Sequence, residues 1–338
     1  MSGTKNKQQL VRHVSFALLS TSMAISAMSA NAAPVYSEWS EPTNAGVNLN
    51  SSARDGCQFV TANGLSMYLA SDRAGGFGGM DLYVARRANV NDDWQAPKLL
   101  GEGINSAYWE ICPTLSPNEK VLFFTSERDG GCNDAEITDP SGTNSLRRDI
   151  YMSTRDDVND DFGWSAPVHL GCSSNGGFNS AKVDQGPYYH ETATGDNYVY
   201  FSSNRTGGKG GHDIYSVKLG SDQSPIVDTI QGIDAVNTSK NDHRPALSNN
   251  GLELYLDSNR RADLVGDHIY VATRLSTNHA FSEPTVVEAI ANGSKDVNRR
   301  VSLANEDTEL YYTTNRTGGS GKVDVWVSTR TSKKNGAN

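Results

Sequence analysis

A glycine-rich turn between two strand-like segments recurs along this chain. The first copy spans residues 71–85 (SDRAGGFGGMDLYVA), where the glycines allow a tight reversal and the last residues alternate as in a half-buried strand. Each copy carries an arginine at the same place: Arg73, Arg128, Arg205, Arg260 and Arg316. Successive arginines are 55, 77, 55 and 56 residues apart. A repeat of this length, with four short strands in each unit, is typical of a β-propeller.

The outer strand of each unit shows how the ring closes. It is marked by an aromatic residue with a proline three positions later, which suits an edge strand. The fifth unit lacks this strand, whereas Trp39 and Pro42 show the same pattern before the first unit. We therefore expect an all-β fold, a single five-bladed β-propeller over residues 33–338 that is closed by an N-terminal outer strand in its last blade. Closure would hide sheet edges that an open array exposes.

These segments resemble the WD40-like repeats of TolB-type propellers. The resemblance rests on the SDRAGG turn at 71–76, the DLY strand at 81–83 and the SPN turn at 116–118, and it covers the chain from about Trp39 to Arg330. It implies a propeller that serves as a periplasmic interaction module, as a part of envelope machinery or as the scaffold of a carbohydrate-active enzyme. Because one fold hosts many functions, the site must carry the functional assignment.

Residues 1–32 are predicted to be a signal peptide. Lys5, Lys7 and Arg12 precede an apolar stretch over 14–25, and Ala30-Asn31-Ala32 matches a cleavage site. The stretch is too short to span a bilayer, so we expect a periplasmic or secreted protein, a monomer without a membrane span. Cleavage would remove three basic residues and change the formal charge from -9 to -12. An acidic protein repels phosphate backbones, which argues against nucleic acid as a partner.

Four cysteines in an exported chain permit disulfides. Cys132 and Cys172 fall on loops that we expect on the same face of the propeller, and we predict that they pair, with two unpaired thiols as the alternative. Cys57 and Cys112 occupy the same position on neighbouring inner strands. They are expected to pair, to fill space in the core or, alternatively, to bind a metal.

The inner strands supply the candidate site, because their first residues differ between blades while the turns repeat. Counting back from each arginine without gaps aligns Asp55, Glu110, Pro187, Asp242 and Asn298, then Gly56, Ile111, Tyr188, His243 and Arg299, then Cys57, Cys112, Tyr189, Arg244 and Arg300, with His190 and Glu191 next in the third blade. We expect these residues at the mouth of the central channel. Arginines bind carboxylates or sulfates by forked hydrogen bonds, and Trp109, Tyr188 and Tyr189 offer flat faces for sugars.

Two functions are compatible with such a mouth. The first is binding of a glycan, a uronate-type anion or an envelope protein, with Trp109, Tyr188, Tyr189, Arg244, Arg299 and Arg300 as ligand-binding residues. The second is a carbohydrate-active enzyme, either a glycoside hydrolase with paired carboxylates or a uronate lyase with a histidine or tyrosine base. Its catalytic candidates are Asp55, Glu110, His190, Glu191, Asp242 and His243. Alternatively, these carboxylates only neutralise the arginines.

No motif in the chain indicates a cofactor. No zinc-ligand spacing, phosphate loop or dinucleotide fingerprint stands out. The glycine-rich turns resemble nucleotide-binding loops, but no helix follows them, as such a loop requires. We therefore expect neither a cofactor nor a catalytic metal. The acidic turns at 91–93 and 156–161 leave a structural calcium ion as an alternative to a solvated turn.

Overall fold

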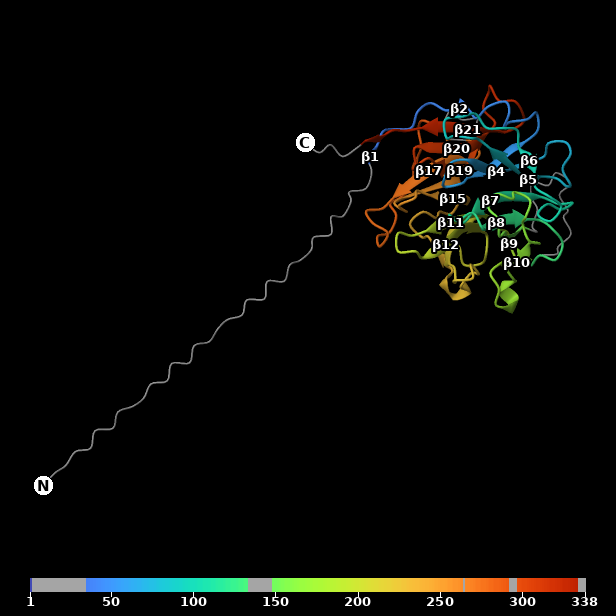
Figure 1. The fold of residues 1–338 in the computed structure, drawn as a ribbon. Helices are drawn as coiled ribbons and strands as arrows, with labels where there is room; N and C mark the ends of the chain where they lie inside the picture. The colour runs from blue at the N-terminus through green and yellow to red at the C-terminus, as the bar shows by residue number, and fades with distance from the viewer. Residues whose placement is uncertain (2–34, 133–147, 264, 292–296, 334–338) are drawn as a thin grey trace. The chain divides into compact units, whose positions relative to one another are not determined.

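The computed structural model describes Met1 and residues 35–132, 148–263, 265–291 and 297–333. The predicted signal peptide lies outside this part of the chain. Within it, the chain forms five four-stranded antiparallel sheets arranged as the blades of a propeller, as predicted (Figure 1). No helix among the described residues is long and apolar enough to cross a membrane.

The blades share one strand order, from the channel outwards. The innermost strands are β3 (Asp55–Val60), β7 (Glu110–Leu115), β11 (Asp184–Glu191), β15 (Asp242–Leu247) and β19 (Asn298–Ala304). The second strands are β4 (Ser66–Ser71), β8 (Val121–Ser126), β12 (Asn197–Ser203), β16 (Glu253–Ser258) and β20 (Glu309–Thr314). The third strands are β5 (Asp81–Arg86), β9 (Asp149–Thr154), β13 (Asp213–Lys218), β17 (His268–Thr273) and β21 (Asp324–Thr329).

The outer strands contain two residues each. They are β6 (Lys98–Leu99), β10 (Val168–His169), β14 (Gln231–Gly232), β18 (Thr285–Val286) and β2 (Thr43–Asn44). Two 3-10 turns, η1 (Ser173–Asn175) and η2 (Val227–Thr229), lie in connections of the third blade. Such short outer strands leave little unpaired backbone at the rim of the wheel.

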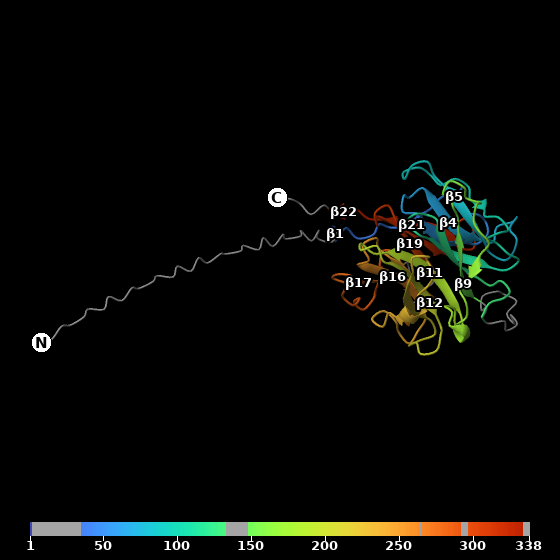
Figure 2. The same ribbon diagram turned by 60° about the horizontal axis from the view of Figure 1, so that its bottom comes forward.

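The N-terminal segment closes the ring, as the sequence predicts. Strand β2 pairs with β21, with Asn44 opposite Trp326, so that blue and red segments lie side by side (Figure 1). Beyond it, β1 (Val35–Tyr36) pairs with β22 (Ser332–Lys333) (Figure 2). Trp39 packs against the apolar cluster that contains Trp326. The first and last parts of the described chain are thus held together by backbone hydrogen bonds.

The hydrophobic core lies between the blades. Five apolar clusters correspond to the five interfaces between neighbouring sheets, including the interface between the last and first blades. The second strands are covered on both faces, and in β4 all six residues are buried. Their tyrosines, leucines and phenylalanines therefore pack against two neighbouring blades, and burial of this apolar surface is the main force that holds the ring together.

A bulge interrupts every inner strand at the same place. The pairing with the second strand shifts after its second residue. The third residue of each inner strand has a positive φ: Cys57 (48°), Cys112 (54°), Gly186 (62°), Arg244 (47°) and Arg300 (67°). Only Gly186 adopts this conformation without a steric penalty from a Cβ atom. A bulge changes the direction of a side chain, and here it distinguishes the channel-facing residues of the five blades.

Both pairs of cysteines form disulfides. Cys132 is bonded to Cys172, as predicted, and joins a loop of the second blade to the connection that leads into the third. Cys57 is bonded to Cys112 across the inner strands of the first two blades. The alternatives that left these cysteines as thiols, core filler or metal ligands are therefore wrong.

Candidate functional site

A cavity of about 690 Å³ occupies one end of the channel. Three tiers of residues line its wall, each defined by a position in the repeat. Immediately before the inner strands lie Arg54, Trp109, Val183, Asn241 and Val297; before the third strands lie Met80, Arg148, His212, Asp267 and Val323; and at the second residue of the inner strands lie Gly56, Gln185, His243 and Arg299. Arg244 and Arg300, at the bulges, form the deepest part. We call this cavity the funnel.

Four of the five arginines in the funnel have acidic partners. Arg54 Nε lies 2.7 Å from Asp72 Oδ2, and Arg148 Nε donates to Glu127 Oε1 (2.8 Å). Arg299 Nε lies 2.8 Å from Asp267 Oδ2, an ionic contact without the alignment of a hydrogen bond.

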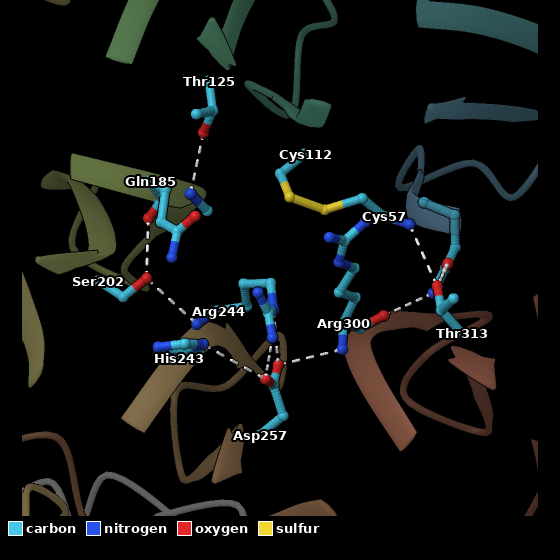
Figure 3. Close-up of a disulfide and its surroundings, with 12 residues drawn as sticks. Cys57, Cys112, Thr125, Gln185, Ser202, His243, Arg244, Asp257, Arg300 and Thr313 are labelled. Carbon is cyan, nitrogen blue, oxygen red and sulfur yellow. Dashed lines mark hydrogen bonds and ion pairs between the residues drawn. A yellow bond between two sulfur atoms is a disulfide. The ribbon is translucent and has the colours of Figure 1, made fainter. Parts of the chain in front are cut away.

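Arg244 binds Asp257 with both Nε (3.0 Å to Oδ1) and Nη2, and this pair is buried (Figure 3). Burial raises the pKa of Asp257, while Arg244 opposes that shift. A forked pair of this kind is rigid, because breaking it would leave an uncompensated charge in the protein interior.

Arg300 differs from the other four. Within the described residues, no carboxylate lies within ion-pair distance of its guanidinium, and its buried Nε has no hydrogen-bond partner. Its backbone does bond, since the N–H donates to Asp257 Oδ1 (3.1 Å) and the carbonyl accepts from Gln58 Nε2 (2.6 Å). Burial, reinforced by Arg244 and Arg299, lowers the pKa of the Arg300 guanidinium well below its usual value. The floor of the funnel therefore favours an anion.

Two histidines stand beside these arginines. The rings of His212 and His243 meet edge to face with centroids 4.4 Å apart. Burial lowers the pKa of His212 to about 4, and burial together with Arg244 lowers that of His243 well below the usual value. Neither ring nitrogen of His243 has a hydrogen-bond partner, although Nδ1 lies 4.0 Å from Asp257 Oδ2. Both rings are thus neutral at neutral pH and can donate or accept hydrogen bonds.

Trp109 lies in the wall of the funnel, but two cations already cover its ring. The guanidinium carbons of Arg54 and Arg148 lie 4.9 and 5.8 Å from the ring centroid. The indole also packs closely on Gly79, where an added Cβ would approach Nε1 to 1.9 Å. Trp109 therefore supports the positions of two arginines, in addition to any contact with a sugar.

The predicted catalytic carboxylates Asp55, Glu110 and Asp242 do not face the funnel. All three are fully buried at the first position of an inner strand, and each accepts hydrogen bonds from a serine or threonine four residues earlier and from the repeated arginine. Asp184 makes the same contacts in the third blade. A group that recurs in four blades with its oxygens occupied belongs to the scaffold, so the expectation that these carboxylates line the mouth is wrong.

Tyr188, Tyr189, His190 and Glu191 were also predicted at the mouth, and this placement is wrong as well. They line a separate space of about 100 Å³ at the other end of the inner strands. The gapless alignment fails in the third blade, because Asp184 precedes its arginine by 21 residues whereas the equivalent residue precedes it by 18 in the other blades. The three extra residues lengthen the far end of the β11–β12 hairpin, and Gly186 takes the bulge position.

Of the predicted site residues, the structure brings together Trp109, His243, Arg244, Arg299 and Arg300. Sequence reasoning missed Arg54, Arg148, His212 and Asp267. These residues directly precede a repeated strand in different blades, at positions whose side chains vary from blade to blade. That variation was visible in the sequence, but the repeat alone did not show that this position faces the channel.

One cluster in the funnel has the residue types of a metal site. Donor atoms of His243, Asp257 and Asp267 all lie within 4.8 Å of one another. However, Arg244 is paired with Asp257 and lies 3.5 Å from Asp267 Oδ2, and Arg299 is paired with Asp267. A cation would have to displace these guanidinium groups, so the residues do not favour a metal here.

Comparisons with known proteins identify the fold. No family model and no curated protein matches the chain. Among solved structures, a GH43_1 enzyme from Xanthomonas citri is similar with a TM-score of 0.56 at 13% identity, over 88% of this chain and 92% of that one. An endo-arabinase from Bacteroides thetaiotaomicron gives 0.53 at 13% identity, over 89% and 99% of the chains. TolB from Acinetobacter baumannii gives 0.45 at 11% identity, over 82% and 55%. At 13% identity, the similarities to the first two structures support the propeller fold alone.

Proposed function

We propose that this protein is an exported propeller that binds an acidic saccharide of the uronate type in the funnel. The observation that carries the proposal is Arg300, a half-buried arginine at the floor of the funnel whose Nε is buried and which has no acidic partner among the described residues. A carboxylate placed there would supply the missing counter-charge. Export is supported by the two disulfides, which persist in oxidising compartments, and by the predicted signal peptide.

The wall of the funnel suits a sugar better than an apolar peptide. Side-chain amides of Gln185, Asn204 and Asn241 and two neutral histidines line it, beside Met80, Trp109 and three valines. Amides and imidazoles can donate to and accept from hydroxyl groups, the main polar groups of a saccharide. A volume of about 690 Å³ lies in the range of small-molecule sites.

A carbohydrate-active enzyme remains the second candidate, and one feature of the funnel favours it. Asp257 and Asp267 bring carboxylate oxygens within 4.8 Å of each other, which resembles the paired carboxylates of glycosidases. Arg244, however, lies between them and pairs with Asp257. Because a general acid must carry a proton and reach the glycosidic oxygen, this arrangement supports binding more strongly than hydrolysis. The similar solved structures include glycoside hydrolases, but at 13% identity they carry no activity to this chain.

The proposal is tested by calorimetric titration with trisaccharides of galacturonate, glucuronate and mannuronate, each beside its neutral counterpart. We expect binding of at least one acidic trisaccharide and none of the neutral ones. Arg300→Gln should weaken binding by about 10- to 150-fold, the loss of one charge-assisted hydrogen bond of roughly 1.5–3 kcal/mol. Arg300→Lys should retain part of the affinity, because it keeps the charge but loses the fork.

The control is Arg261→Gln, which removes an exposed arginine that is paired with Asp263 outside the funnel. Equal losses in the two glutamine variants would show that only the net charge of the protein matters. Binding of neutral and acidic trisaccharides alike, or no binding at all, would contradict the proposal. Mass spectrometry of the same mixtures after long incubation detects hydrolysed or unsaturated products, and their appearance in the wild type but not in Asp257→Asn would favour the enzyme.

A further inference from the structure

The funnel is closed at its inner end. Below it, the bulge residues Cys57, Cys112, Arg244 and Arg300 surround a space of only about 20 Å³, about the room of one water molecule. The Cys57–Cys112 disulfide spans one side of this constriction, and Arg300 extends towards it (Figure 3). A saccharide chain therefore has no path through the channel, and whatever enters the funnel must leave by the same opening.

The unpaired cation lies at this closed end. Arg300 lines both the funnel and the constriction below it, whereas Val297, three residues earlier and just before β19, lines only the funnel. Three residues of extended chain span at most about 10 Å, and the bulge shortens this distance somewhat. The paired arginines Arg54, Arg148 and Arg299 line the funnel but not the constriction. The attraction for an anion is thus strongest at the bottom of the cavity.

A carboxylate in the middle of a chain does not suit this geometry. It projects from its sugar ring by one C–C and one C–O bond, roughly 2.5 Å. To place such a group at the floor, both flanking parts of the chain would have to fold into the same opening. A terminal sugar, by contrast, enters end-on and leaves only one chain to pass the rim.

We infer that the funnel recognises the end of an acidic saccharide chain, with the carboxylate of the terminal uronate at Arg300. This inference rests on the proposed function and narrows its ligand from acidic saccharides in general to their termini. The amides and histidines of the wall would then contact the hydroxyl groups of the terminal sugar. The following sugars would pass the rim near Arg54 and Arg148, whose charges already have acidic partners.

The test is a length series of one homopolymeric uronate, from the trisaccharide to a long polymer, titrated into the intact mature protein. If ends are recognised, the affinity per chain stays constant with length, so that the affinity per uronate residue falls in proportion to length. If internal sugars are recognised, the affinity per residue stays constant and the affinity per chain rises. The second result would overturn the inference while leaving the proposed function intact, whereas failure of every length to bind would overturn the proposed function itself.

A second arm uses the hexasaccharide with its internal carboxylates methyl-esterified and a fully esterified control. Binding of the first within a few fold of the unmodified hexasaccharide, together with loss of binding by the second, is expected. Loss of binding by both would contradict end recognition. Arg300→Gln should lower the affinity for the unmodified and the internally esterified hexasaccharide by the same factor, because both would place the same terminal carboxylate at the floor. Different factors for the two would also contradict the inference.

Discussion

The turn between β19 and β20 contains a buried carboxylate that makes the stability of the protein depend on pH. Asp307 is 3% exposed, and both of its carboxylate oxygens accept the Asn249 N–H at 3.0 Å. Burial raises the pKa of Asp307 to about 6, and the nearby Glu253 and Glu306 contribute to the shift while Arg330 opposes it. The folded protein therefore binds a proton here more tightly than the unfolded chain, in which an aspartate has a pKa of about 3.9.

The sign and size of the effect follow from linkage. Stabilisation by the protonated form of Asp307 is complete below about pH 4 and is lost as the pH rises through about 6. A difference of about two pKa units corresponds to about 3 kcal/mol at neutral pH. Asp307→Asn keeps an acceptor for Asn249 but carries no charge, and asparagine tolerates the positive φ of 62° at this position. We therefore expect the variant to be more stable than the wild type above about pH 7, by up to about 3 kcal/mol, and the difference to shrink towards about pH 4.

Urea unfolding followed by tryptophan fluorescence, at several pH values between about 4 and about 8, measures this difference. Glu306→Gln is the matched control, because it removes an exposed negative charge from the same turn without touching the buried carboxylate. A difference between Asp307→Asn and the wild type that does not change with pH would refute the reasoning. If Asp307→Asn is less stable than the wild type at every pH, the hydrogen bonds that the wild-type carboxylate accepts from Asn249 outweigh the cost of burying its charge.

Two further changes test the scaffold around the funnel. Replacing Cys132 and Cys172 by serine removes a crosslink that spans 40 residues and should lower the free energy of unfolding by roughly 4 kcal/mol, as measured by urea unfolding. An unchanged free energy of unfolding would mean that the disulfide does not reduce the conformational entropy of the unfolded chain. Gly186→Ala places a Cβ 2.7 Å from Arg244 Cγ and should weaken binding of the acidic trisaccharide. The control is Gly195→Ala, which also has a positive φ but whose added Cβ would meet no atom within 4 Å. This control variant should lower the stability of the protein without weakening binding. Equal effects of the two alanine variants on binding would remove Arg244 from the site.

The sequence was sufficient for the fold because each blade repeats the same short-range signals. The missing outer strand of the fifth unit, together with Trp39 and Pro42 ahead of the first, determined how the ring closes. The five-bladed fold and the closure of its ring could both be predicted because each strand is marked by residues that lie close together in the sequence. The exact register of one blade did not follow, because the three extra residues of the β11–β12 hairpin lie between two landmarks and the sequence does not say at which end of the strands they are placed.

The site was only partly predictable, for a related physical reason. Arg299 and His243 were found because they follow the repeated acidic position by one residue in correctly aligned blades. The direction of a side chain, however, depends on the backbone, and the bulge reverses the simple alternation of a strand. Asp55 and Glu110 precede the bulge and follow the ordinary alternation: they are neighbours of funnel positions in sequence, yet their side chains point into the blade and bind serine and arginine.

The scaffold and the funnel are connected through one position of the repeat. In four blades, the inner strand begins with a buried carboxylate that binds the arginine of the glycine-rich turn. In the fifth blade the same position is Asn298, a buried amide without charge. That blade therefore carries one negative charge fewer beside the funnel, and it is also the blade that contributes Arg299 and Arg300. Because the interior screens charge poorly, the loss of this carboxylate raises the positive potential at the floor and adds to the attraction of Arg300 for an anion.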